Sequence, residues 1–356
     1  MPSLKRFLSY RPMAELEAAF PASPPALSPM QVGIQSVLHS TDQLQAVVWA
    51  DLTGGEAQLL TRASAMSIPA VARQRHLVCG TAAGCPLVVL QDDIRLPVQP
   101  RWPSRTDGQL SPYHRTLWTV DDLLFHGWSL WSAQRGHGNE LLSAERIPIE
   151  RWEADEVGRI SVDGELVNAS EVILIPGPHE GILNFGSASL LRMLDNLDAA
   201  ATAARNPSAY LELHYTGDVP LTDTQIDGLI DRWAKARRGE NGGVSYTGKN
   251  LEVKEHGTHE SHLLIEGRNA DAVDASRMVS SPAAMADATA AGASLTYETT
   301  SGRNQQFLDY GAKFYMDAMA ARLSMDDVVP RFQRTAFDTG NLTATAPAAT
   351  GPATED

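Results

Sequence analysis

The stretch EVILIPGPHEGILNFGSASLLRMLDNLDAAATAARNPSAYLELHYTGDVPLTDTQIDGLIDRWAKARR, residues 171–238, sets the order of elements on which the rest of the fold depends. EVILIP predicts a strand, and a loop rich in glycine and proline follows it. A long helix rich in alanine, a second strand and a helix with a basic end come next. The sequence therefore predicts a small module of strands and a helix that begins where a long helix ends.

The long helix is predicted over residues 187–205. Its apolar stripe, close to a seven-residue period, consists of Leu190, Leu194, Leu197, Ala201 and Ala204. The helix should end before Asn206-Pro207, because the residue before a proline avoids helical backbone angles. The small residues of the stripe allow other helices to approach closely, so we expect helix contacts along it.

A further helix, over residues 221–239, carries both start and stop signals. Thr222 and Gln225 fit a capping box, and Gly239 is a suitable C-terminal stop. The apolar face consists of Ile226, Leu229, Ile230 and Trp233. Strand-like residues 210–215 precede this helix, and residues 242–248 and 250–256 are strand-like after it.

One local concentration of positive charge lies within this module. It consists of Lys235, Arg237, Arg238, Lys249 and Lys254. The set could contact DNA or an acidic partner. The alternative is that these are ordinary charges at a helix C-terminus, where the dipole favours them, together with a solvated strand face.

A second long helix is predicted over residues 269–291, with a kink or break at Ser281-Pro282. A polar loop with the sequence SLTYETTSGRN, residues 294–304, leads from it to a helix over residues 305–324. The module of strands and helix therefore lies between two long helices.

The part of the chain before the quoted stretch mixes helices and strands, which gives an α+β fold class. Strands are expected at residues 46–52, 86–91, 128–134, 144–149 and 159–164, and helices at 67–84 and 113–127. Five of the seven tryptophans fall between Trp102 and Trp152, which favours a core over a ligand site. Residues 1–30 predict a peripheral arm, and residues 340–356, almost without bulky apolar side chains, predict a flexible tail.

Composition excludes several classes of protein. With 356 residues, 43% hydrophobic and 20% charged, the chain can bury one large or two medium cores. It has no run long enough for a membrane helix and no apolar signal core at its start, so we expect a soluble protein made in the cytoplasm. A net charge of -14 argues against a protein that holds nucleic acid tightly.

Residues 243–250, GVSYTGKN, nearly match a phosphate-binding loop. Asn250 stands where the pattern needs Ser or Thr, and strand-like sequence follows where a helix must begin. A hairpin turn over residues 247–250 explains these residues better than an ATP site.

Other patterns also give no catalytic or metal site. His256, His259 and His262 recur every third residue, a spacing that converges on a metal only in a turn, so solvated loop histidines are favoured. Cys79 and Cys85 have no activating base nearby in sequence and are expected to be buried thiols. We therefore expect no catalytic residue, no cofactor and no metal.

Several runs resemble the portal proteins of tailed double-stranded DNA phages, and look like portals of actinobacterial long-tailed phages. They are GILNFGSASL, AYLELHYTGD, LLIEGRNADAVDASR, SLTYET and RLSMDDVVPRFQRTAFDT. The resemblance covers about residues 32–338 and implies the portal fold. Its parts would be an N-terminal arm (1–30), a wing (31–186), two stem helices (187–205 and 269–292), an αβ clip (206–268), a tunnel loop (293–303), a kinked channel-crossing helix with a wing return (304–339) and a tail (340–356). The chain after Met325 is too short for a large crown, which should be reduced or absent.

The resemblance implies a structural protein and not an enzyme. Twelve or so copies would form a ring at one capsid vertex of the virion, the conduit for genome packaging and ejection. The implied partners are copies of the chain itself, the major capsid protein, the large terminase, a head-tail adaptor protein and, transiently and without sequence specificity, double-stranded DNA. No membrane is implied. An acidic wall suits a passage through which DNA must slide.

Particular residues follow from the same resemblance. The tunnel loop would line the channel through Ser294, Thr296, Glu298, Thr299, Ser301 and Arg303. The basic set named above would be the partner surface of the clip, and Trp233 its core. Two alternatives stay open, a smaller head-tail adaptor ring protein and a P-loop packaging ATPase.

Overall fold

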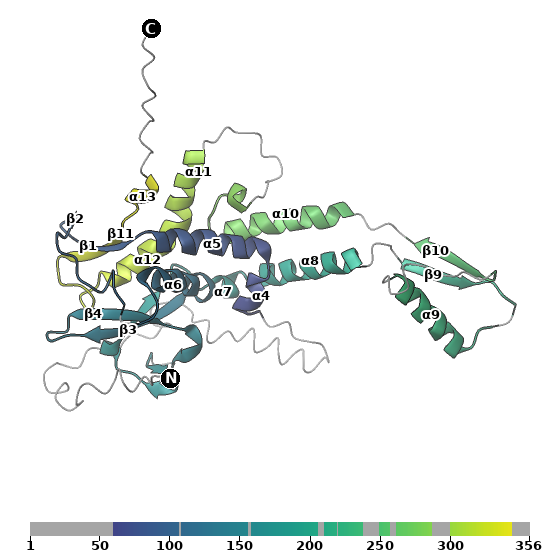
Figure 1. Cartoon of the computed structure of the whole chain (residues 1–356), viewed down its shortest axis with the longest axis horizontal. Coiled ribbons are helices and arrows are strands. Elements are labelled where there is room, and N and C mark those ends of the chain that lie inside the picture. Colours follow the sequence, from purple (N-terminus) through teal and green to yellow (C-terminus); the bar gives the residue numbers. More distant parts are fainter. Residues whose placement is uncertain are drawn as a thin grey trace, which may run out of the picture.

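The computed structural model describes residues 60–106, 108–155, 158–205, 210–218, 220–237, 249–256, 261–286 and 300–343. The expected arm over residues 1–30 and the expected strand over residues 46–52 lie outside these ranges. Figure 1 divides the described part into a body of helices and small sheets, a pair of long helices that extends from it, and a separate module beyond their ends. The mixture of helices and strands confirms the α+β class.

Two helices, α5 (Pro69–Gly84) and α6 (Pro112–His126), cross the body after the short α4 (Arg62–Met66). Proline is the first residue of both α5 and α6, a position where its missing N–H costs no hydrogen bond. Ser111 caps α6, and Gly127 ends it with a left-handed φ of 78°, which glycine adopts without a steric penalty. The sequence predicted both helices to within two residues.

Three small antiparallel sheets complete the body. The first has the order β11-β1-β2, with β1 (Leu87–Gln91), β2 (Ile94–Arg95) and β11 (Gln333–Phe337). The second has the order β4-β3-β8, with β3 (Trp128–Arg135), β4 (Leu141–Ile147) and β8 (Val172–Pro176). The third has the order β5-β6-β7, with β5 (Trp152–Ala154), β6 (Ile160–Val162) and β7 (Glu165–Leu166). Because β1 pairs with β11, residues near the C-terminal end of the described chain lie beside residues near its N-terminal end.

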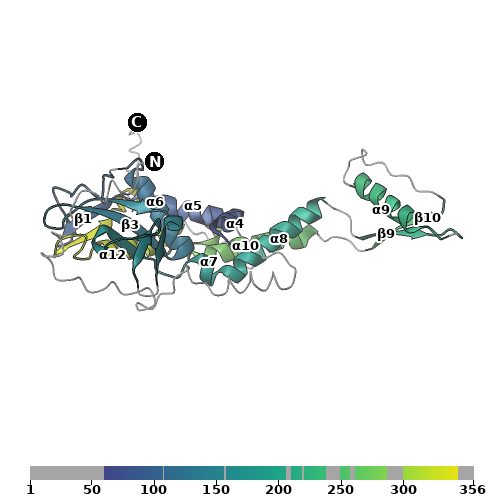
Figure 2. The same cartoon turned by 90° about the horizontal axis from the view of Figure 1, so that it is seen from below.

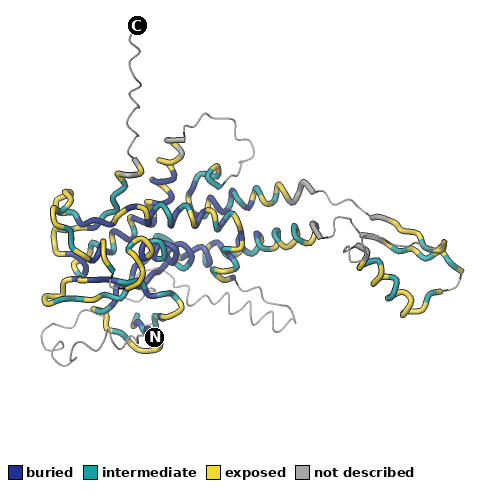
Figure 3. The backbone as a smooth tube through the Cα atoms, in the orientation of Figure 1, coloured by how far each residue is buried: buried dark blue, intermediate teal, exposed yellow. Residues whose placement is uncertain are grey.

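The body holds two apolar cores. The larger joins α5, α6, β3 and β8 to the near ends of the two helices over residues 187–205 and 261–278. Val78, Leu123, Trp131 and Met319 are fully buried in it. The smaller lies around Trp128 and Trp152. Both cysteines are buried and free, as expected. Figure 3 places nearly all the buried backbone in the body and at the near ends of the long helices.

The long helices differ in part from the prediction. The first, α8 (Ser187–Arg205), has the predicted bounds. The second, α10 (Ser261–Met278), begins eight residues earlier than predicted and ends before the expected break at Ser281-Pro282. Ser280, with φ 54°, turns the chain there, and a short 3-10 helix, η4 (Ala283–Ala286), follows.

The last helical region is divided into three. It consists of α11 (Thr300–Gln306), a π-helical segment η5 (Phe307–Ala312) and α12 (Lys313–Leu323). Residues 300–303, expected in a loop, are therefore helical. Residues 340–343, expected in a flexible tail, form the single turn α13 (Gly340–Thr343), and residues 344–356 lie outside the described ranges.

Candidate functional site

Helices α8 and α10 lie side by side and antiparallel, and we call them the two-helix arm (Figures 1 and 2). Leu190 and Met193 of α8 are fully buried at its near end. Polar contacts continue the pairing, because Arg192 binds Asp274 at 2.6 Å and the Asn196 side-chain amide donates to Asp271 at 2.9 Å. Beyond Asn196, no residue of α8 whose side chain is described is buried.

Beyond the arm lies a module of three elements, which we call the distal module: β9 (Tyr210–Tyr215), α9 (Asp223–Arg237) and β10 (Leu251–His256). The strands form an antiparallel ribbon with Leu213 opposite Val253. In both Figures 1 and 2 the helix α9 lies along one face of this ribbon. At the start of α9, the Gln225 side chain accepts from the backbone N–H of Thr222 at 3.1 Å, which is one half of the predicted capping box.

The distal module has no interior of its own among its described side chains. None of them is buried, and the two best-covered residues on the apolar face of α9, Leu229 and Trp233, are only half-buried. Ile226 and Ile230, on the same face, are 41% and 53% exposed. A two-stranded ribbon is marginally stable by itself, and the helix beside it leaves Ile226 and Ile230 exposed. The isoleucine edge of the module is therefore open to a neighbour.

The predicted basic set does not form one patch on a single element. Lys235 is exposed on α9, while Lys249 and Lys254 are exposed at the turn before β10 and on β10. Lys254 stands opposite Glu212 in the ribbon register, a pairing of opposite charges across the strands. The side chain of Arg237 and all of Arg238 lie outside the description.

The predicted channel residues fall mostly outside the described ranges. Ser294, Thr296, Glu298 and Thr299 do so entirely. Ser301 and Arg303 belong to α11, and nothing is described of their side chains. In the π-helical segment that follows α11, Phe307 and Leu308 are buried, and Tyr310 is 68% exposed. Segments of π-helix often mark functional positions within longer helices.

A glycine-rich loop over residues 177–181 joins β8 to the short helix α7 (Ile182–Phe185) and so to the arm. The N–H of Gly177 donates to the carbonyl of Gly127 at 2.7 Å. A Cβ on Gly127 would lie 2.6 Å from the carbonyl oxygen of His179, and a Cβ on Gly181 would lie 2.4 Å from that of Phe125. This approach of backbones requires glycine and fixes where the arm leaves the body.

His179 in this loop connects it to α12. Its Nδ1 accepts from the backbone N–H of Gly181 at 2.9 Å, so its neutral form carries the proton on Nε2, which donates to the Tyr315 hydroxyl at 2.7 Å. Burial lowers the pKa of His179 to about 4 and raises the pKa of Tyr315 above its usual value. The histidine is therefore neutral at pH 7. Sequence reasoning missed this contact, because it identified residues 177–181 only as part of a loop rich in glycine and proline.

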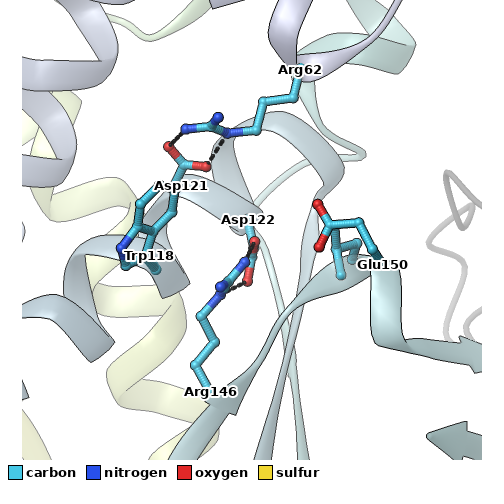
Figure 4. A pocket seen from close by; sticks show the side chains of 7 residues that line it. Arg62, Trp118, Asp121, Asp122, Arg146 and Glu150 are labelled. Atoms are coloured by element: carbon cyan, nitrogen blue, oxygen red, sulfur yellow. Dashed lines mark hydrogen bonds and ion pairs between the residues drawn. The ribbon is translucent and has the colours of Figure 1, made fainter. Parts of the chain in front are cut away.

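A charged cleft of about 290 Å³ opens on the body (Figure 4). It is lined by Arg62, Trp118, Asp121, Asp122, Arg146, Ile149 and Glu150. Asp121, 1% exposed, binds Arg62 at 2.6 Å and Arg75 at 2.5 Å, and these guanidinium groups lie over the Trp118 ring.

Asp122 occupies the same cleft. It binds Arg146 through two oxygens at 2.6 Å, yet burial raises the pKa of Asp122 to about 6. Because the arginines that face the cleft are paired with aspartates of the same chain, the cleft is an internal ion-pair network that fixes α4, α5, α6 and β4. The sequence signal for it was a pair of adjacent acids inside an apolar helix.

The structure after Lys249 and Asn250 contradicts the phosphate-loop alternative. A phosphate-binding loop must lead into a helix, but Lys249 and Asn250 form a turn that leads into the strand β10. Among the predicted histidines, His256 ends β10, His259 lies outside the described ranges, and His262 belongs to α10 with its side chain undescribed. The described residues hold no cluster suited to a metal ion, and none of their helices is both long and apolar enough to cross a membrane.

Solved structures place this architecture among known proteins. An HK97 family phage portal protein from Corynebacterium diphtheriae is 34% identical, with a TM-score of 0.70, over 81% of this chain and 98% of its own. The neck of an empty gene transfer agent particle, computed with C6 symmetry, is 15% identical with a TM-score of 0.55 over 87% of each chain. A virion of the native gene transfer agent is 15% identical with a TM-score of 0.53 over 87% of this chain and 88% of its own.

These likenesses carry different weight. The two gene transfer agent structures, at 15% identity, establish the fold alone. No family sequence profile and no curated protein sequence matches the chain. The Corynebacterium diphtheriae protein agrees in sequence and in fold over nearly its whole length. The chain therefore belongs to the HK97 family of phage portal proteins.

Proposed function

We propose that this portal protein forms a ring of about twelve copies at one vertex of the capsid and that the genome passes through the ring during packaging and ejection. The observation that carries the proposal is the distal module, which has no buried side chain among those described and extends on a two-helix arm from a well-packed body. A module built in this way needs neighbours, and a ring of identical copies supplies one neighbour on each side.

In this proposal the parts have the roles that the family resemblance implied. The body is the wing, α8 and α10 are the stem helices, and the distal module is the clip. Residues 293–303 and the following helical region lie at the channel, with η5 as the kink in the crossing helix. A reduced or absent crown belongs to the same proposal; in the described part the single turn α13 follows β11.

The partners follow from the same roles. The clip would meet the large terminase during packaging and a head-tail adaptor afterwards, and the wing would meet the major capsid protein. Exposed Lys249 and Lys254 are available to acidic partner surfaces. Double-stranded DNA would make transient contacts only, because a chain of net charge -14 supplies few cations to hold phosphates. Synthesis would take place in the host cytoplasm and the final location would be the virion.

The central test is the state of assembly. We expect native mass spectrometry of the purified full-length chain to give a closed oligomer of about twelve copies, and negative-stain images to give a ring with a projecting stem. A chain that remains monomeric or dimeric at every protein and salt concentration, and also when co-expressed with the capsid protein, would refute the ring. A flat ring without a stem would instead point to an adaptor-like role.

A further inference from the structure

Helix α9 leaves part of its apolar face uncovered. Ile226 and Ile230 lie one turn apart and are 41% and 53% exposed, whereas Leu229 and Trp233 are half-buried. One edge of the apolar face is therefore partly covered, and the isoleucine edge is open. Val253 of the ribbon is also 37% exposed. Adjacent exposed aliphatic side chains of this kind mark a contact with another molecule when they are bordered by charge.

The charges of α9 are divided between its two sides. Asp223 and Arg232 are nine residues apart, about two and a half turns, so they project from opposite sides of the helix. Asp227 lies one turn beyond Asp223, next to the isoleucine edge, and Lys235 lies one turn beyond Arg232. All four side chains are exposed, and the structure joins none of them to a described residue in an ion pair. Asp231, which is also exposed, lies between the two sides, one turn before Lys235. The side of α9 next to the isoleucines is thus acidic, and Arg232 and Lys235 give the far side its basic charge.

Such a division is self-complementary between copies of one chain. In a closed ring each copy presents one side to the neighbour on its left and the other side to the neighbour on its right, so unlike surfaces meet at every interface. Opposite charges at that contact set its register and exclude the reversed orientation, in which acidic sides would face each other. A foreign partner would have to supply both a basic and an apolar surface, whereas the neighbouring copy already supplies the basic one.

We propose that in the ring the acidic side of α9, made of Asp223, Asp227, Ile226 and Ile230, packs against the basic side of the neighbouring copy's α9, made of Arg232 and Lys235. The contact rests on the ring of the proposed function and goes beyond it, because it fixes the direction in which neighbouring modules face. It also gives Arg232 and Lys235 a role between subunits, so Lys235 is not free for an external partner once the ring is closed.

The test uses reciprocal charge reversal in the full-length chain. One variant carries Asp223→Lys and Asp227→Lys, and a second carries Arg232→Glu and Lys235→Glu. A third carries all four changes. The matched control reverses two acids on the exposed surface of the body, Glu153→Lys and Glu165→Lys, which changes the net charge as much as the first variant does. Ring formation is followed by native mass spectrometry and by sedimentation at low salt, and wild-type rings are established first.

Each two-residue variant alone should need about tenfold more protein to assemble, or should not assemble, since like charges then face each other at every contact. An equal mixture of the two should form rings in which they alternate, which native masses distinguish from random mixing. The four-residue variant should assemble alone, and the control should behave as wild type. Recovery in the mixture also proves that the variants fold.

Three results would overturn the contact. If the wild-type chain forms rings and both two-residue variants assemble as the control does, the proposed charge pairing is wrong. The proposal of a ring is not affected by that result. Variants that fail alone, fail when mixed and fail when all four changes are combined, beside a normal control, would assign these residues to folding or to a foreign partner. A wild-type chain that never forms rings would remove the proposed function and the contact together.

Discussion

Replacing His179 with glutamine should remove a defined part of the pH dependence of folding. The imidazole is largely enclosed, accepts from the Gly181 N–H at 2.9 Å and lies 2.7 Å from the Tyr315 hydroxyl. Its pKa falls from 6.5 in the unfolded chain to about 4 in the folded one because burial disfavours the charged ring. Protonation would also remove the acceptor that Gly181 uses.

The sign of the effect follows from linkage. A base whose pKa is lower in the folded state takes up its proton first in the unfolded state, so stability is lost as the pH falls from 6.5 towards 4. Between about pH 7 and pH 4.5 the loss assigned to His179 is about 2.5 kcal/mol, because the full slope of about 1.4 kcal/mol per pH unit applies only well between the two pKa values. Asp122 opposes it in an overlapping range, because a carboxyl whose pKa is raised to about 6 favours folding as it is protonated.

The measurement must therefore be a difference between two proteins. Urea unfolding of the wild-type chain and of His179→Gln, followed by tryptophan fluorescence, gives the free energy of unfolding at each pH. At pH 7 the variant should be less stable by about 1 to 3 kcal/mol because two partly buried hydrogen bonds change. Near pH 4.5 the gap should close or reverse. A gap that is the same at both pH values would refute the assignment of a neutral, buried His179.

Three further predictions concern packing and assembly. Asp121→Leu should lower the free energy of unfolding in urea by about 3 to 5 kcal/mol, because Arg75 then stays buried without its partner. The double variant Asp121→Leu with Arg75→Met should recover most of that loss, and a double variant as unstable as the single one would contradict this account. Trp233→Ala should cost the isolated chain less than about 3 kcal/mol, since the indole is only half-buried there, but should impair ring formation and DNA packaging; normal assembly and packaging would argue against the distal module as the clip. Gly311→Ala should lower the thermal midpoint and cost about 1 to 3 kcal/mol of stability, because the new methyl group lies 3.0 Å from the Phe307 ring. Gly267→Ala in α10 serves as the control, because its methyl group meets only Asn196 Nδ2, at an ordinary contact distance of 4.0 Å.

Local signals predicted the elements that carry their own start and stop residues. Helix α8 was predicted to the residue, and α9 to within two residues, because proline, glycine and capping side chains act within one turn of the helix ends. The ribbon strands β9 and β10 were predicted for the same reason, since alternation is a property of neighbouring residues.

The errors arose where distant parts of the chain decide the structure. Residues 261–268 contain Gly267 and a histidine, which favour a loop locally, yet they belong to α10, which packs along α8. Tertiary contact outweighs the cost of a glycine in a helix, about 1 kcal/mol. The bond between Gln74 and Ser276 at 2.9 Å, and that between Asp121 and Arg62, join residues far apart in sequence, so no local pattern could have predicted them.

Substitutions in the body and in the distal module should change different measured quantities, because the two parts differ in how far their side chains are buried. The body buries four tryptophans in two cores and pairs the buried Asp121 and Asp122 with arginines of the same chain, so changes there act on the free energy of unfolding of a single copy. The distal module buries none of its described side chains and leaves two isoleucines and both sides of α9 open. In the proposed ring its stability should therefore depend on protein concentration, because a bound neighbour would cover its apolar face. Unfolding of the module that becomes harder as rings form, while unfolding of the body does not change, is the behaviour expected of a subunit whose clip is finished only by assembly.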